Sequence, residues 1–255
     1  MPYITLGSDG EEEIFYEYHD GGGEESLVLV HGSGGDHTHW PRQLRQLSGF
    51  CVYAPDLPGH GRSGGRGRRS VGDYAAAIQA FVARLGLSGV TLFGHSLGGA
   101  VVQSIALEKP DWLSRVVLVG TGARLRVAPE ILSAIRMDYP AAVEEIVSWA
   151  YGPDAPVALV EEGREQFLGN EPDVVFGDYS ACDGFDITDR LGEISVPALV
   201  ISADNDRLTP IKYGRFLAEG IPQAELSLIE GAGHMMTLER PEALVSSVCD
   251  FLKRR

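Results

Sequence analysis

The sequence has few cysteines, no long apolar run and a shortage of basic residues, and each shortage excludes a class of protein. Its 255 residues include three cysteines, Cys51, Cys182 and Cys249, too scattered for a disulfide framework or a CxxC zinc or redox motif. We expect them to be small buried side chains in a reducing cytoplasm. The apolar run at residues 27–30 is far shorter than the ~20 residues of a membrane span, and we see no export signal.

Basic residues are outnumbered by acidic ones. The chain has 21 Lys and Arg against 36 Asp and Glu, a net charge of −15. Because such a surface repels phosphates, we expect no nucleic-acid partner, and neutral or weakly polar small molecules are favoured over polyphosphates as substrates. Apolar residues at 44% and charged residues at 22% are ordinary values for a globular protein, which excludes global disorder and a coiled coil.

What the sequence does have is a regular alternation of strand-like and helix-like segments. Residues 13–18 are β-prone and roughly alternating. Six later segments are short and largely apolar, as in strands buried on both faces of a parallel sheet: 26–31, 51–54, 90–93, 116–119, 198–201 and 226–229. Helix-period segments follow at 74–85, 99–108 and 241–252. The alternation predicts an α/β protein with a mostly parallel central sheet flanked by helices.

One region interrupts this alternation. Residues 123–193 contain helical pieces and spaced aromatic side chains but no strong strand. We expect residues 1–122 and 194–255 to form the core, with a helical cap at 123–193 inserted after the sixth strand. Large side chains of the cap are expected to line an apolar pocket, with Met137, Trp149 and Tyr151 as the candidate substrate-binding residues and the following as further candidates: Tyr139, Phe167, Phe176 and Tyr179.

The strongest local pattern is Gly-x-Ser-x-Gly at residues 94–98, directly after a predicted strand and directly before a predicted helix. In this context the pattern predicts a tight turn that holds the Ser96 hydroxyl clear of the backbone, with glycines where side chains would collide. Because a hydroxyl is a poor nucleophile at neutral pH, Ser96 needs a base beside it. The turn therefore predicts a nucleophilic serine.

With these motifs the sequence resembles the α/β-hydrolase superfamily. Residues 31–35 resemble its oxyanion loop, 56–63 its turn after the next strand, 204–210 its acid-bearing loop and 231–234 its histidine loop. The resemblance implies an α/β-hydrolase fold and a carboxylesterase-like serine hydrolase that needs no cofactor. It also implies the catalytic residues Ser96, Asp206 and His234, whose order along the chain is the one this fold requires.

Two assignments within the site rest on the same resemblance. Asp204 is a rival for the acid, but Asp206 lies four residues before Pro210, as the acid does in the family's motif. The oxyanion hole is assigned to the backbone N–H groups of Ser33 and Leu97. Leu97 also opens a helix, whose positive end favours an anion.

The sequence Asp36-His37-Thr38-His39 has three side chains that could bind a metal at short spacing. No further ligand cluster accompanies them, so we expect no metal. His31 and His60 are expected to brace loops, and His95 to lie at the strand end beside the nucleophile.

The run at residues 180–186 resembles a stretch of ester-hydrolysing family members. We expect cleavage of a carboxylic ester through an acyl-Ser96 intermediate, which water then hydrolyses. A lactonase, a thioesterase, a perhydrolase and a carbon–carbon bond hydrolase remain alternatives within this chemistry, and a slow-turnover ligand sensor is an alternative of another class. The carbon–carbon bond hydrolase would need basic side chains near the site, for which the candidates are Arg124, Arg126, Arg136 and Arg164.

Overall fold

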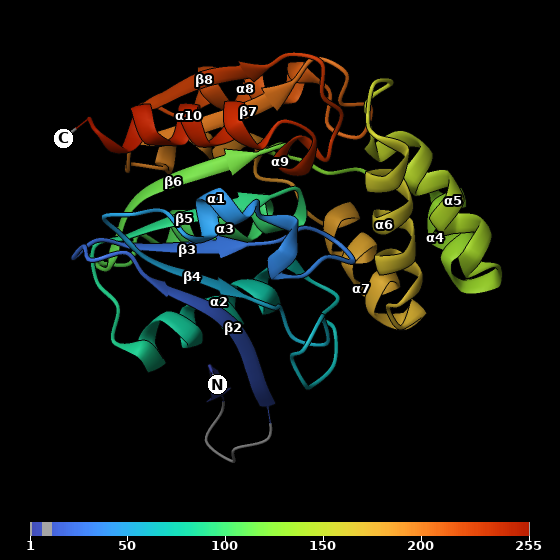
Figure 1. The fold of residues 1–255 in the computed structure, drawn as a ribbon, viewed down its shortest axis with the longest axis horizontal. Helices are drawn as coiled ribbons and strands as arrows, with labels where there is room; N and C mark the ends of the chain where they lie inside the picture. The colour runs from blue at the N-terminus through green and yellow to red at the C-terminus, as the bar shows by residue number, and fades with distance from the viewer. Residues whose placement is uncertain (1, 7–11, 255) are drawn as a thin grey trace.

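The computed structural model describes residues 2–6 and 12–254, and a single sheet runs through its centre (Figure 1). Among these residues eight strands pair in the order β1-β2-β4-β3-β5-β6-β7-β8. Their bounds are β1 Tyr3–Leu6, β2 Glu12–Asp20, β3 Ser26–Val30, β4 Cys51–Pro55, β5 Val90–His95, β6 Leu113–Val119, β7 Ala198–Ala203 and β8 Ala224–Ile229.

Strands β3 to β8 pair in parallel, whereas β1 and β2 pair antiparallel at one edge. The prediction of a mostly parallel α/β sheet is confirmed. Strand β3 shows why its sequence is continuously apolar, because Val28 and Val30 pack on one face of the sheet while Leu27 and Leu29 pack on the other. A strand with two covered faces has no position left for a polar side chain.

Helices cover both faces of the sheet. The core that includes α2 (Val71–Leu85), α3 (Leu97–Glu108) and α8 (Ile211–Gly220) lies on one face. The core that includes α1 (Arg42–Arg45), α9 (Met236–Glu239) and α10 (Pro241–Leu252) lies on the other. Local signals set the ends of α2, since Ser70 accepts a hydrogen bond from the Asp73 N–H and Gly86 ends the helix at a φ of 63°. Two short 3-10 helices, His37–His39 and Thr188–Glu193, complete the described helices.

Four α-helices lie between β6 and β7 in the sequence, and we call them the helical insertion: α4 (Pro129–Met137), α5 (Tyr139–Ala150), α6 (Val157–Leu168) and α7 (Pro172–Asp183). Figure 1 shows them to one side of the sheet, beyond the carboxyl ends toward which the arrows of the parallel strands point. Asp138 separates α4 from α5, because its carboxylate accepts a hydrogen bond from the Ala141 N–H and starts a new helix. The carboxyl ends of parallel strands are where ligands bind in open α/β sheets.

None of the helices in the described part of the chain is long and apolar enough to cross a membrane. The three cysteines are free thiols, of which only Cys182 is buried. The expectation that all three are buried is wrong for Cys51 and Cys249, which are half-buried.

Candidate active site

Ser96 stands on a strained turn between β5 and α3. Its φ of 53° lies in the left-handed region that side chains other than glycine rarely adopt. The flanking glycines are needed for contact reasons, since a Cβ atom on Gly94 would lie 2.2 Å from the carbonyl oxygen of Gly98. A Cβ on Gly98 would lie 2.2 Å from the carbonyl oxygen of Val30. The turn can therefore close only with these glycines, and it leaves Ser96 half-buried among buried neighbours.

His234 and Asp206 are joined by a hydrogen bond of 2.9 Å between Nδ1 and Oδ2. The Asp206 carboxylate also accepts hydrogen bonds from the Leu208 and Thr209 N–H groups and from the Thr209 hydroxyl. Burial raises the pKa of Asp206, but the attraction of His234 and these hydrogen bonds outweigh it and lower the pKa to about 2. Asp206 is therefore an anion, so His234 donates its Nδ1 proton to it and keeps Nε2 as the basic nitrogen.

Asp204 lies elsewhere. Its side chain is exposed and accepts hydrogen bonds from the Gly231 N–H at 2.8 Å and from the Asn205 side chain at 2.9 Å. It thus connects the 204–210 loop to the histidine loop. The geometry places Asp206, and not Asp204, against His234.

His95 supports the histidine loop through a hydrogen bond to its backbone. Its Nε2 donates to the backbone carbonyl of His234 at 3.0 Å, and the two rings lie 4.8 Å apart between centroids. Burial, helped by repulsion from His234, holds the pKa of His95 well below its usual range, so its ring is neutral. The sequence predicts His95 beside the nucleophile. The contact of His95 with His234 could not be predicted, because the two residues are 139 positions apart and no local pattern indicates it.

The loop that contains Ser33 passes directly against the nucleophile. A Cβ atom on Gly32 would lie 3.1 Å from the Cβ of Ser96, so only a glycine allows this approach without displacement. Ser33 and Ser96 both line the same pocket, and Leu97 is the first residue of α3. The two backbone groups expected to bind an oxyanion therefore come from segments that flank Ser96.

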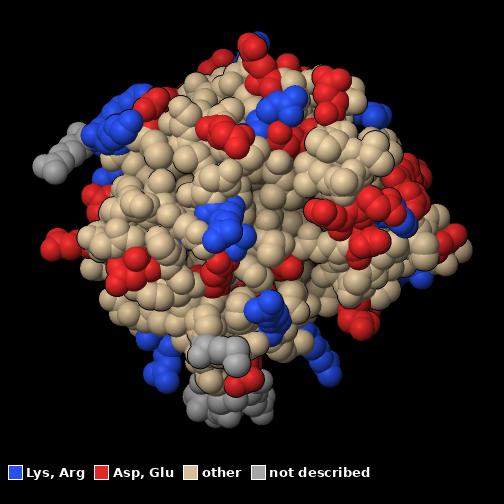
Figure 2. All heavy atoms as spheres, viewed as in Figure 1, with Lys and Arg blue, Asp and Glu red and all other residues tan. Residues whose placement is uncertain are grey.

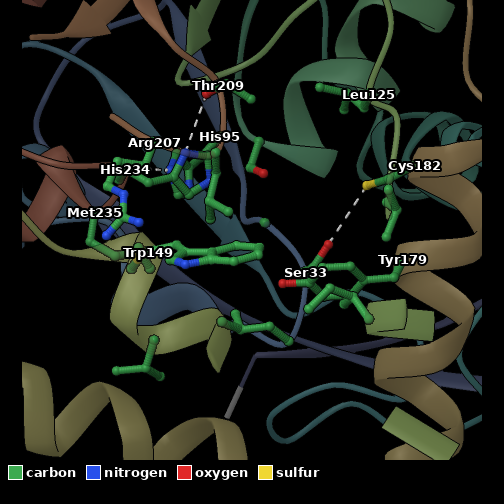
Figure 3. Close-up of a pocket in the computed structure, with 18 of the residues that line it drawn as sticks. Ser33, His95, Leu125, Trp149, Tyr179, Cys182, Arg207, Thr209, His234 and Met235 are labelled. Atoms are coloured by element: carbon green, nitrogen blue, oxygen red, sulfur yellow. Dashed lines mark hydrogen bonds between the residues drawn. The ribbon is translucent and has the colours of Figure 1, made fainter. Parts of the chain in front are cut away.

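Ser96 and His234 both line a pocket of about 290 Å³. Figure 3 shows this pocket, with His234 and Thr209 on one side and Ser33, Cys182 and Tyr179 on another. Its wall is mostly apolar and comes from the helical insertion and the segment before it. The apolar side chains of this wall are Leu125, Val127, Ile131, Ile146, Val147, Trp149, Tyr151, Phe167 and Tyr179. Cys182 also lines it, 3.8 Å from the Ser33 hydroxyl. Burial raises the pKa of this thiol to about 12, so it remains protonated and does not compete with Ser96 as a nucleophile.

The candidate wall residues divide into two groups. Trp149 and Tyr151 line the pocket, and their contact with a substrate stays a prediction. Met137 does not line the pocket: it is the last residue of α4 and is 86% exposed to solvent. The prediction for Met137 is corrected, because helical spacing alone does not reveal which face of an insertion helix meets the core. Of the further candidates, Tyr139 and Phe176 pack within the insertion and do not line the pocket.

The structure also shows which of the candidate arginines line the pocket and which lie elsewhere. Arg124 pairs with Asp186, Arg164 pairs with Glu144 and Glu161, and the Arg136 guanidinium lies 3.7 Å from the centre of the Phe176 ring. Arg126 lines the pocket and also pairs with Asp183 at 3.7 Å. Arg207, which the sequence did not single out, lines the pocket too. Arg207 directly follows Asp206, and that position was the one available signal.

Asp36, His37 and Asp56 lie close enough together to suggest a metal site. Asp56, however, already accepts hydrogen bonds from the His37 N–H, the His37 ring and the Arg62 N–H. Asp36 accepts two from Thr38. His39, the third possible ligand in the 36–39 sequence, instead contacts the Gln166 side chain at 3.1 Å. These hydrogen bonds indicate that the cluster stabilises the loop in which it lies.

Comparisons with known proteins identify the family of this chain. A sequence model described as the alpha/beta hydrolase family matches residues 27–247, and the chain belongs to that family. It is 30% identical to "Putative carbamate hydrolase RutD" of Agrobacterium fabrum, over 89% of this chain and 92% of that protein. It is also 30% identical to a 2-hydroxy-6-oxononadienedioate/2-hydroxy-6-oxononatrienedioate hydrolase of Burkholderia vietnamiensis, over 99% and 95% of the two chains. A solved structure of a thermophilic esterase is 37% identical with a TM-score of 0.86, over 99% of this chain and 97% of its own.

Proposed function

We propose that this hydrolase cleaves carboxylic esters through an acyl-Ser96 intermediate. The proposal is supported chiefly by the Asp206–His234 hydrogen bond, because His234 lines the same pocket as Ser96. A strained turn that presents a serine to such a pair is useful for nucleophilic attack and has no evident packing purpose. We further propose that residues 123–193 act as the cap that selects the substrate, and that the chain works in the cytoplasm.

In the proposed reaction His234 Nε2 takes the Ser96 proton as Oγ attacks the ester carbonyl carbon. The oxyanion that forms is bound by the N–H groups of Ser33 and Leu97, and Asp206 stabilises the imidazolium. His234 then gives its proton to the departing alcohol, which leaves the acyl group on Ser96. Water, deprotonated by His234, attacks this acyl group, and release of the acid restores the Ser96 hydroxyl. Every proton is carried by His234, so the proposed reaction needs no cofactor.

The surroundings of the pocket favour a neutral ester. Its wall is apolar, and exposed glutamates gather on the outer side of α5 and α6 at residues 144, 145, 161, 162 and 165 (Figure 2). Together with the net charge of −15, they repel anions at long range. The apolar wall also favours an ester with a hydrocarbon chain over a small polar carbamate.

A second candidate is hydrolysis of a carbon–carbon bond in a ketone that carries a carboxylate. The observation that favours it is the presence of two exposed guanidinium groups, Arg126 and Arg207, in the lining of the pocket. The relative from Burkholderia vietnamiensis bears the name of a hydrolase of hydroxy-oxo-dienedioates, which are substrates of this kind. A carboxylate-bearing ketone needs these arginines to bind its carboxylate, whereas a neutral ester does not. The two candidates can therefore be separated.

The deciding experiment is steady-state hydrolysis of p-nitrophenyl esters from acetate to decanoate, with Ser96→Ala as the control. We expect sustained turnover of neutral esters and a loss of about 10⁵-fold or more in the variant, as for other serine nucleophiles. The same assay with a 2-hydroxy-6-oxo-dienoate tests the second candidate. A single slow release of p-nitrophenol without further turnover would overturn the esterase proposal and favour the ligand sensor.

A further inference from the structure

Asp178, in the middle of α7, is completely buried and accepts three hydrogen bonds from segments far away in the sequence. Its Oδ2 accepts from the Gly34 N–H at 2.9 Å and faces His60 Nε2 at 2.8 Å, and its Oδ1 accepts from the Tyr74 hydroxyl at 2.5 Å. A carboxylate at this depth is costly unless each oxygen is paired, and here each is. The helical insertion thus places a charged acceptor inside the core.

The neighbour His60 is held in its charged form by geometry. Its Nε2 faces the Asp178 carboxylate and its Nδ1 faces the carbonyl oxygen of Pro58 at 3.1 Å, so both ring nitrogens meet acceptors. With Asp178 ionised, both contacts are hydrogen bonds only if both nitrogens carry protons. Burial lowers the pKa of His60, but Asp178 outweighs it and the pKa is raised. His60 and Asp178 therefore form a buried ion pair with no solvent exposure of either side chain.

Asp178 also holds the loop next to Ser96, through its hydrogen bond from the Gly34 N–H. Gly34 follows Ser33, has a φ of 62°, and would collide with Phe167 of α6 if it had a Cβ, at 2.7 Å. Its N–H is held by Asp178, and its carbonyl oxygen accepts from the Asn170 side chain at 2.9 Å. Both peptide groups of Gly34 are thus held by α7 and by the segment between α6 and α7, although the loop itself belongs to the core.

We propose that Asp178 is a positioning residue for the oxyanion hole: through the Gly34 N–H it holds the loop so that the Ser33 N–H faces the developing charge. The inference rests on the proposed function, because it assigns Asp178 a part in that same reaction. It means that the insertion shapes the catalytic step as well as the substrate pocket. An oxyanion donor acts mainly in the transition state, so its displacement lowers kcat more than it changes KM.

The test is Asp178→Asn, with Asp173→Asn as the matched control on the exposed first turn of the same helix. An asparagine has the same shape but only one acceptor oxygen, so one of the donors around it must face an NH2 group. We expect kcat for p-nitrophenyl acetate, per active site titrated with a fluorophosphonate, to fall about 10- to 100-fold, with KM within about twofold. The control variant should match the wild type.

Binding of a trifluoromethyl ketone gives a readout that a purely structural role would not change. This inhibitor forms an oxyanion on the serine, so its affinity should fall by the same factor as kcat/KM in Asp178→Asn. Tyr74→Phe keeps the charge and removes one donor, and it should lower kcat per site by a smaller factor, about threefold. If Asp178→Asn does not fold, Tyr74→Phe decides.

Wild-type kcat per active site in the folded variants would overturn the inference. If instead the wild-type protein shows no Ser96-dependent turnover, the proposed function itself fails. The two failures are thus distinguishable in one set of measurements.

Discussion

Two regions of the site differ in burial. His234 and its partner Asp206, which we call the floor of the pocket, are buried and hydrogen-bonded, whereas the helices of the wall carry very exposed apolar residues. Asp206 is 4% exposed and His234 is 5% exposed, and each is held by further groups of the core. In the insertion, α6 has no fully buried residue, and Met137 and Val157 project into solvent. The proposed chemistry therefore depends on fixed geometry, while the wall needs only an apolar surface of suitable size.

The floor and the wall of the pocket differ because they have different tasks in the proposed reaction. Reaction at Ser96 requires donors and acceptors aligned to within a fraction of an ångström, which close packing at the strand ends provides. An apolar acyl chain is bound by non-directional burial, so different side chains can supply the wall. Two buried carboxylates connect the regions. Asp178 acts on the oxyanion loop, and Glu239 accepts hydrogen bonds from Gly152 after α5 and from Gly233 in the histidine loop.

The largest effect is expected from changing the floor. Asp206→Asn should lower kcat about 10⁴-fold, because a neutral amide no longer fixes the tautomer of His234 or stabilises its charge. The matched control is Asp204→Asn, in the same loop, which should remain within a few-fold of the wild type. Ester hydrolysis of both variants checks this. Equal losses in the two variants would mean that Asp204 shares the role of the acid.

The next effect concerns acid stability. The pKa of Asp206 is lowered from 3.8 to about 2, so the folded protein binds this proton less readily than the unfolded chain. Its contribution is present above the unfolded pKa near 4 and is lost as the pH falls through about 2, and it amounts to about 2 kcal/mol. Urea unfolding at pH 7 and near pH 2 should show that Asp206→Asn lacks this part of the loss. An unchanged pH dependence in the variant would contradict the cause assigned to the shift.

A smaller effect is expected from changing the wall. Trp149→Ala should lower kcat/KM for short esters about tenfold and shift the preferred chain to a longer one, because the indole leaves space that a longer acyl group can fill. A p-nitrophenyl ester series measures the shift. If the chain-length profile keeps its shape, Trp149 does not size the acyl site, and the contrast between floor and wall is weaker than we infer.

The smallest effect is expected at Met137. Met137→Ala removes an 86% exposed side chain, so stability should change by less than about 0.5 kcal/mol and the chain-length profile should be unchanged. Thermal unfolding and the same ester series check it. A change as large as that of Trp149→Ala would show that α4 turns its other face to the substrate when the pocket is occupied.

Much of the fold was predictable because its signals are local. Apolar segments such as 198–201 identify strands with two buried faces, and the Gly-x-Ser-x-Gly turn places Ser96 at the end of one of them. The acid and histidine loops follow two further strands of the same sheet, so their meeting place follows from the parallel topology. The split of the insertion at Asp138 was less evident, since an aspartate within a helical period can also be an exposed side chain.

The α/β architecture, the nucleophile turn and the candidates for its partners could be predicted without the structure, because each depends on a spacing within a few residues. Only the tertiary structure decided that Trp149 faces the pocket and Met137 faces solvent, and that Arg207 joins Arg126 in the lining. It also placed Asp178 against Gly34, 144 residues away along the chain. Such contacts depend on how helices pack on a sheet, and no local pattern of residues encodes that arrangement.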